Sequence, residues 1–212
     1  MSQSEVSAWL QFALQQMAAE SYLDGIDWDN AEQVKAQLRL GNNRPGFPQA
    51  GATRFTGTIN QGLQDQAFVD RYQVVDHHAN DATGFSATLM QERDQSGRLT
   101  NNFTLSFRST EYLSQPQGDG ERDAILGADG EIVGVGFALA QLVSMERYYR
   151  ELKADPTKLP PGAILNVTGY SLGGHLATVF TELHASDIAH TYTFNGAGGR
   201  KRCQEPLFAR AA

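Results

Sequence analysis

The stretch Ala163–Leu183, AILNVTGYSLGGHLATVFTEL, decides the fold of this chain. Its first five residues form an apolar run, rich enough in aliphatic and β-branched side chains to predict a buried strand. The pentapeptide GYSLG follows over 169–173, and apolar residues then recur at helical spacing as far as Leu183. A strand, a G-x-S-x-G turn and a helix in this order are typical of a nucleophile elbow, which presents a serine on a sharp turn.

The elbow places physical demands on the residues around Ser171. A serine on so sharp a turn has strained backbone angles, so Gly169 and Gly173 must lack side chains that would clash. The helix directs its first N–H groups to the place where an oxyanion would form. Gly174 leaves room for this helix to pack close to the sheet. The pattern predicts Ser171 as a nucleophile, and a purely structural glycine-rich turn is the alternative.

Length and composition restrict the class of protein. A chain of 212 residues can form one domain with a sizeable core, and 41% hydrophobic with 19% charged residues is an ordinary soluble composition. The net charge of −7 argues against nucleic acid as a partner. No apolar run approaches the roughly 20 residues of a membrane span. The one cysteine, Cys203, cannot form an internal disulfide.

Hydrophobic periodicity predicts the elements around the elbow. Helices are expected over 5–23, 30–40 and 132–152, with Asp29 as a candidate N-cap and a short helical turn at 68–72. Strands are expected over 72–77, 85–92 and 103–107 as an antiparallel meander, with 44–64 and 114–130 as loops. The strand at 163–167, its helix and a strand at 190–194 alternate as in βαβ units, which predicts parallel pairing.

Two of these helices have apolar stripes, and we interpret that of the first helix as core packing. The stripe of the first helix consists of Val6, Trp9, Leu10, Ala13, Leu14 and Met17. The stripe of the helix at 132–152 consists of Val135, Leu139, Leu142, Val143 and Tyr149. A lipid-facing lid is the alternative for the first helix, supported by nothing beyond its amphipathicity.

The last 14 residues differ in composition from the rest. Residues 199–212 hold the basic residues Arg200, Lys201, Arg202 and Arg210 against the single acid Glu205, with neither strand alternation nor a helical stripe. A foreign end, such as a frameshift would produce, and a native basic surface tail both fit this composition. We therefore expect a single α/β domain over 1–198, with an N-terminal helical segment, and an atypical tail over 199–212.

A second motif extends the pattern to a known family. With Phe107-Arg108-Ser109-Thr110-Glu111 and the GYSLGG elbow, the chain resembles the class 3 lipases, in particular bacterial secreted lipases and phospholipases A1. The resemblance spans about residues 68–198 and implies an α/β-hydrolase fold, with a mixed, mostly parallel sheet flanked by helices. It implies Ser171 as the nucleophile and the N–H groups of Thr110 and Leu172 as the oxyanion hole. It also implies that Arg108 holds the oxyanion loop, and that Ser109, in place of the family's glycine, narrows or stiffens it.

The resemblance also shows what the chain lacks. The family's triad follows the order Ser, Asp, His, yet no Asp and no His follow Phe194. The resemblance therefore implies a chain truncated before the catalytic Asp and His, with the C-terminal part of the fold missing.

The histidines that are present are weak substitutes for the missing base. His175 lies one helical turn after Ser171, where packing against the sheet is the favoured interpretation. His184 would lie about 20 Å further along the same helix. For His77 and His78 we favour a surface location.

No cofactor is expected. Asp119, Asp123 and Asp129 crowd one loop and could bind calcium, but no spacing matches a calcium motif, so a solvated acidic loop is favoured.

The function expected by resemblance is that of a lipase or esterase, a serine carboxylic ester hydrolase acting on acylglycerols or phospholipids. The alternative is a truncated, catalytically impaired homologue that only binds acyl ligands or needs a further segment for activity. Such a chain would form oligomers or pair with a complementing C-terminal chain, because its last strand leaves an open sheet edge. The resemblance implies secretion, although the N-terminus lacks signal-peptide features. A protein without an export signal would be cytoplasmic.

Overall fold

A mixed sheet forms the centre of the molecule, with five strands among the described residues. The computed structural model describes residues 3–42, 53–57, 63–109 and 138–196. The strands lie in chain order: β1 (Tyr72–His78), β2 (Ala87–Arg93), β3 (Leu99–Phe107), β4 (Ile164–Tyr170) and β5 (Ile188–Phe194). The first three pair antiparallel, whereas β3, β4 and β5 pair parallel. The predicted meander, the predicted parallel pairs and the mixed α/β fold class are thereby confirmed.

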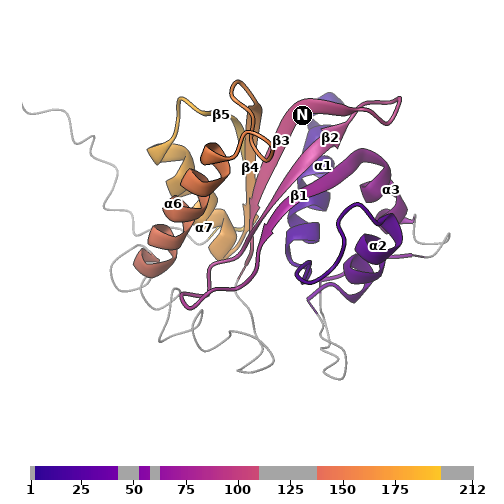
Figure 1. The fold of residues 1–212 in the computed structure, drawn as a ribbon, viewed down its shortest axis with the longest axis horizontal. Helices are drawn as coiled ribbons and strands as arrows, with labels where there is room; N and C mark the ends of the chain where they lie inside the picture. Colours follow the sequence, from indigo (N-terminus) through magenta and orange to yellow (C-terminus); the bar gives the residue numbers. More distant parts are fainter. Residues whose placement is uncertain (1–2, 43–52, 58–62, 110–137, 197–212) are drawn as a thin grey trace, which may run out of the picture.

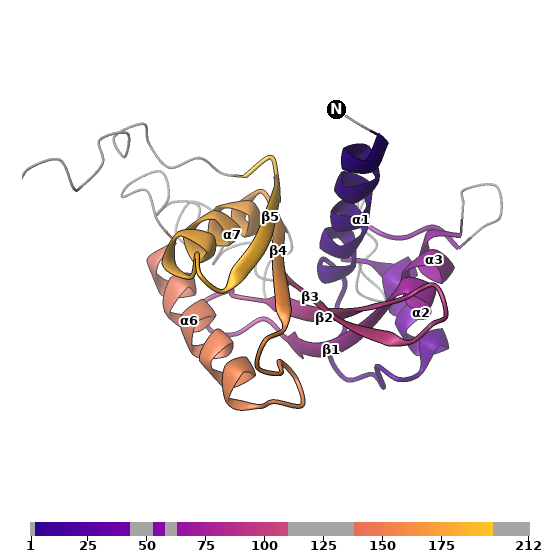
Figure 2. The same ribbon diagram turned by 90° about the horizontal axis from the view of Figure 1, so that it is seen from above.

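Helices cover both faces of this sheet. The described helices are α1 (Gln3–Ala19), α2 (Ala31–Leu40), α3 (Gln64–Arg71), α6 (Leu139–Ala154) and α7 (Leu172–Leu183). Figures 1 and 2 show α6 and α7 on one face and α1, α2 and α3 on the other. None of the described helices is both long and apolar enough to cross a membrane.

The face under α6 and α7 holds the larger apolar core. Phe103, Leu105 and Phe107 of β3 and Leu165 and Val167 of β4 are buried there among side chains of the two helices. Their alternation along each strand places every second residue on this face. Because β4 is buried here beside β3, its position is fixed in the sheet, and so is the position of the turn that follows it.

The opposite face is polar at its centre. Alternation directs Thr104 and Ser106 of β3 and Thr168 of β4 away from the apolar core, and all three are buried. The facing helix, α1, likewise buries Gln15 and Gln16, which are 3% and 6% exposed. A smaller apolar cluster flanks this region and includes Ala18, Ala19, Val34, Leu38, Phe68 and Met90.

This packing corrects the predicted role of the stripe on α1. Val6, Trp9 and Leu10 are 43%, 41% and 62% exposed, so the first half of the stripe does not enter the core. Trp9 instead packs edge-on against the rings of Tyr192 and Phe194 of β5. Periodicity shows which residues share a helix face, but not which face the sheet covers.

The apolar positions predicted in the next long helix are buried only in part, with Tyr149 in the core. Leu139 and Val143 are 52% and 70% exposed, while α6 buries Met145, Tyr148 and Leu152. The start predicted at residue 132 lies outside the described residues, and the described helix begins at Leu139.

Several boundaries also move. The N-cap of α2 is Asn30, whose side chain accepts hydrogen bonds from the N–H groups of Glu32 and Gln33, rather than Asp29. The helical turn predicted at 68–72 is the longer helix α3. The 114–130 loop with its three aspartates, the 199–212 tail and most of the predicted 44–64 loop lie outside the described residues.

Candidate active site

Ser171 is the single residue between the end of β4 and the start of α7, on the turn that joins them. Its φ and ψ angles are 52° and −117°, a conformation that residues other than glycine rarely adopt. The Ser171 N–H donates to the Phe194 carbonyl at 3.0 Å, and its own carbonyl accepts from the His175 N–H at 3.1 Å. The turn is therefore held on one side by the neighbouring strand and on the other by the first turn of the helix.

Three glycines make this turn sterically feasible. A Cβ on Gly169 would lie 2.2 Å from the Gly173 carbonyl oxygen, and a Cβ on Gly173 would lie 2.2 Å from that of Phe107. A Cβ on Gly174 would lie 2.8 Å from the Cα of Gly196. Because each of these neighbours is backbone and cannot rotate away, any side chain would displace a strand or the helix.

The end of β3 lies against the start of α7. In the parallel register Phe107 pairs with Gly169, and a Cβ on Gly173 would lie 2.7 Å from the Arg108 carbonyl oxygen. Leu172, the first residue of α7, is buried, and no side-chain hydrogen bond caps the helix at Ser171. Thr110, the other expected oxyanion donor, lies outside the described residues. The roles of Leu172 and Thr110 therefore stay predictions.

Two of the five histidines lie on a distant strand. His77 is level with Thr168 of β4 but three strands away, because the order is β1-β2-β3-β4. Adjacent strands lie about 4.8 Å apart, so these two backbones are separated by about 14 Å. The same spacing separates His78 from β4, and neither imidazole can reach the Ser171 hydroxyl.

His77 is also not the surface residue that the sequence predicts. Its Nδ1 is hydrogen-bonded to the Thr88 hydroxyl at 2.9 Å, and its Nε2 is shielded from solvent. Burial, followed by the positive charges of Arg108 and His78, lowers the pKa of His77 to about 3. The imidazole is therefore neutral in the folded protein at neutral pH.

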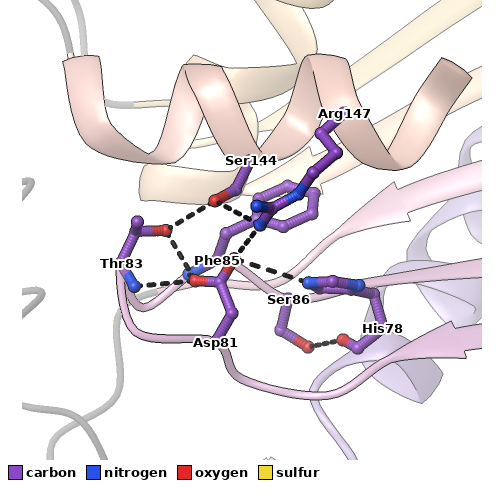
Figure 3. A network of polar contacts seen from close by, with 7 residues as sticks. All are labelled: His78, Asp81, Thr83, Phe85, Ser86, Ser144 and Arg147. Carbon is purple, nitrogen blue, oxygen red and sulfur yellow. Dashed lines mark hydrogen bonds and ion pairs between the residues drawn. The ribbon is translucent and has the colours of Figure 1, made fainter.

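His78 belongs to a polar network that ties the connection between β1 and β2 to α6 (Figure 3). The Asp81 carboxylate accepts hydrogen bonds from the Thr83 N–H at 2.7 Å and the Thr83 hydroxyl at 2.6 Å. The same carboxylate lies 3.5 Å from the Arg147 guanidinium and 3.5 Å from the Nε2 of His78. Burial raises the pKa of Asp81, but hydrogen bonds from Thr83 and Ser144 outweigh burial and lower this pKa overall. His78 has a structural partner in this network.

His184 and His190 lie at the other end of the β4–α7 unit. His184 follows α7 and its Nε2 lies 2.7 Å from Glu146, about 20 Å from Ser171 along the helix axis. His190 pairs with Asn166, five residues before Ser171, or about 16 Å along the strand direction. Both are too distant to act as a base for Ser171.

His175 is the histidine that the fold leaves within one turn of Ser171. It is 5% exposed and lies on α7 at a rise of about 6 Å from the serine. Residues four apart share a helix face, so its side chain lies on the same side of the helix as Ser171.

No metal site is found in the described part of the chain, where no group of three or more His, Cys, Asp or Glu side chains converges. The three loop aspartates considered for calcium fall outside it.

The chain is similar to solved structures of fungal lipases. The lipase of Rhizopus microsporus var. chinensis aligns with a TM-score of 0.51 and 13% sequence identity, over 91% of this chain and 58% of that one. The chain has the α/β-hydrolase fold. Lipase II from Rhizopus niveus aligns with a TM-score of 0.44 and 13% identity, covering 92% of this chain and 64% of its own. Lip2 lipase from Yarrowia lipolytica aligns with a TM-score of 0.42 and 15% identity, covering 92% of this chain and 59% of the Yarrowia lipase.

At these identities the likeness to fungal lipases concerns the fold. No protein-family model matches this sequence, and no curated protein matches it either. The chain spans 58% of the length of the Rhizopus microsporus lipase. The bacterial and phospholipase A1-like resemblance stays a prediction.

Sequence reasoning missed one residue of this α/β-hydrolase fold that contacts the expected oxyanion segment. Glu20 is buried just after α1, and its carboxylate accepts hydrogen bonds from the N–H and the hydroxyl of Ser109. The two residues are 89 positions apart. No local pattern could have revealed this pair, because a glutamate at a helix end is ordinarily solvated.

Proposed function

We propose that the chain is a serine carboxylic ester hydrolase, a lipase or esterase, with Ser171 as the nucleophile. The observation that carries this proposal is the backbone of Ser171, at φ 52° between β4 and α7, with three glycines packed against it. Strain of this kind costs of order 1–3 kcal/mol and is typical of functional sites. A structural turn at the same place could use glycine and avoid that cost.

The proposed chemistry is acyl transfer. The Ser171 hydroxyl attacks the ester carbonyl, and the N–H groups of Leu172 and Thr110 bind the resulting oxyanion. The alcohol leaves with a proton, and water then releases the acid from the acyl-enzyme. Leu172 begins α7, so the partial positive charge of the helix N-terminus adds to this stabilisation. Acylglycerols or phospholipids are the proposed substrates, and secretion is the proposed location.

A general base for this reaction is the component of the site with the least support. Four of the five histidines lie too far from Ser171, which leaves His175. Without a base, catalysis falls to the roughly 10³–10⁴-fold over water that binding and the oxyanion hole supply. We therefore expect weak esterase activity from this chain by itself. The distances of those four histidines favour a second candidate, in which the chain binds acyl ligands or needs a further segment for turnover.

A covalent probe and an activated ester test the proposal together. The purified chain is treated with a fluorophosphonate and separately assayed with p-nitrophenyl butyrate. Ser171→Ala should abolish labelling and hydrolysis, whereas Ser186→Ala, at an exposed serine beyond α7, should leave both unchanged. Labelling that persists in Ser171→Ala would refute the nucleophile. Full-strength turnover that requires Ser171 would instead refute the expected weakness and direct attention to His175.

A further inference from the structure

Glu20 is a buried carboxylate that accepts several hydrogen bonds. It is 3% exposed, and it accepts hydrogen bonds from the Ser109 N–H at 3.0 Å and from the Ser109 hydroxyl at 2.6 Å. The Gln16 side-chain amide donates to the same carboxylate. Removing a carboxylate from water costs several kcal/mol unless hydrogen bonds replace its hydration. The contact with Ser109 therefore constrains both segments strongly.

Glu20 binds Ser109, and the two residues before Ser109 lie at the end of β3 against the start of α7. The two residues before Ser109 already touch that helix, because a Cβ on Gly173 would meet the carbonyl oxygens of both Phe107 and Arg108. The Arg108 N–H is bound in turn by the Ser86 carbonyl at 3.1 Å. Ser109 is thus one residue beyond backbone that is in van der Waals contact with the proposed catalytic turn.

A second contact joins the same two segments. The guanidinium carbon of Arg108 lies 4.0 Å from the ring centroid of Tyr22, in the geometry of a cation–π pair. Arg108 is 4% exposed, so this stacking takes place away from solvent. Two consecutive residues after β3 are therefore bound by the short segment 20–22 that follows α1.

We propose that Glu20 is a positioning residue for ester hydrolysis, which binds both polar groups of Ser109 and so fixes the oxyanion segment. The inference rests on the proposed function. The peptide bond that joins Ser109 to Thr110 carries the Thr110 N–H, which is the proposed oxyanion donor. Such a donor acts only when it is held about 3 Å from the oxyanion, and losing one costs about 10²–10³ in kcat. A glycine at position 109 would offer Glu20 the N–H alone, whereas serine adds its hydroxyl.

The test compares variants on both sides of the contact. Ser109→Ala removes one hydrogen bond, Glu20→Gln keeps the size of the side chain and an acceptor oxygen, and Glu20→Ala removes both bonds. With p-nitrophenyl butyrate we expect kcat to fall about tenfold in Ser109→Ala, less in Glu20→Gln and more in Glu20→Ala, with KM changed less than about twofold. The double variant Glu20→Ala/Ser109→Ala should be no slower than Glu20→Ala, since both act through one contact. Glu182→Gln, an exposed carboxylate on α7, is the matched control.

Each other outcome has a distinct meaning. If kcat stays unchanged in the Glu20 and Ser109 variants while Ser171→Ala abolishes activity, the positioning role is wrong and the proposed function stands. If the unaltered chain shows no Ser171-dependent labelling or turnover, the proposed function fails and the positioning role fails with it. Hydrogen exchange separates a local effect from unfolding. A loss of activity that is accompanied by loss of amide protection throughout β4 and α7 would show a merely structural residue and overturn the proposal.

Discussion

Acidification from pH 7 to pH 5 should destabilise the fold through His77. Burial, reinforced by the charges of Arg108 and His78, lowers the pKa of His77 from 6.5 to about 3 in the folded protein. His77 therefore binds a proton near pH 6.5 in the unfolded chain but stays unprotonated at that pH in the folded chain. Stability is fully present above pH 6.5 and is lost as the pH falls toward 3, because proton uptake favours the unfolded state.

The size of this destabilisation follows from the lowered pKa of His77. Each pH unit below 6.5 lowers the free energy of unfolding by about 1.4 kcal/mol, so the loss at pH 5 is about 2 kcal/mol. Four described carboxylates have pKa values that are lowered in the fold, and they also weaken stability in acid: Asp81, Asp94, Asp155 and Asp187. The stability that these aspartates contribute is lost only near and below their ordinary pKa of 3.8, so it does not change between pH 7 and pH 5. Within that interval, comparison with a variant at position 77 isolates the contribution of His77.

Urea unfolding monitored by tryptophan fluorescence measures this effect, with Trp9 and Trp28 as reporters. His77→Gln retains a polar group for Thr88 but does not titrate. The free energy of unfolding of the unaltered chain should fall by about 2 kcal/mol more than that of His77→Gln between pH 7.5 and pH 5. His190→Gln, at an exposed position of β5, serves as the control and should behave like the unaltered chain. Parallel pH dependence in the unaltered chain and His77→Gln would refute the reasoning.

Three further substitutions test the packing around the site. Gly173→Ala places a Cβ 2.2 Å from the Phe107 carbonyl oxygen and should lower the free energy of unfolding by about 3 kcal/mol, measured by urea unfolding; a loss below 1 kcal/mol would contradict the geometry. Ser171→Gly should be about 1 kcal/mol more stable than Ser171→Ala in thermal unfolding, because glycine relieves the positive φ. Asp81→Ala leaves the N–H and hydroxyl of Thr83 without their acceptor and should lower the free energy of unfolding by about 2 kcal/mol. The amides of α6 should lose hydrogen-exchange protection first, and unchanged exchange in α6 would argue against the network.

The sequence alone determined the elbow and the sheet around it. The requirement for glycine at 169 and 173 is local, since it arises from the backbone of a turn only a few residues long. The alternation of side chains in three successive strands likewise specified an antiparallel meander, and the β–α–β order specified parallel pairs. Period-2 and period-3.6 patterns record local geometry, so such elements can be recognised without knowledge of their neighbours.

Tertiary structure decided which faces those elements bury and which polar groups meet. The apolar stripe of α1 gave no sign that Gln15 and Gln16 would be buried while Leu10 stayed exposed, because the centre of the facing sheet is polar. Burial of His77, and with it the lowered pKa, depends on neighbours such as Thr88 of β2 and Arg108 after β3 rather than on its own strand alone. The bond between Glu20 and Ser109 joins residues 89 positions apart, and only the packed chain brings them together. A pattern of residues specifies the direction of a side chain, whereas the partner it meets is fixed only when the elements pack.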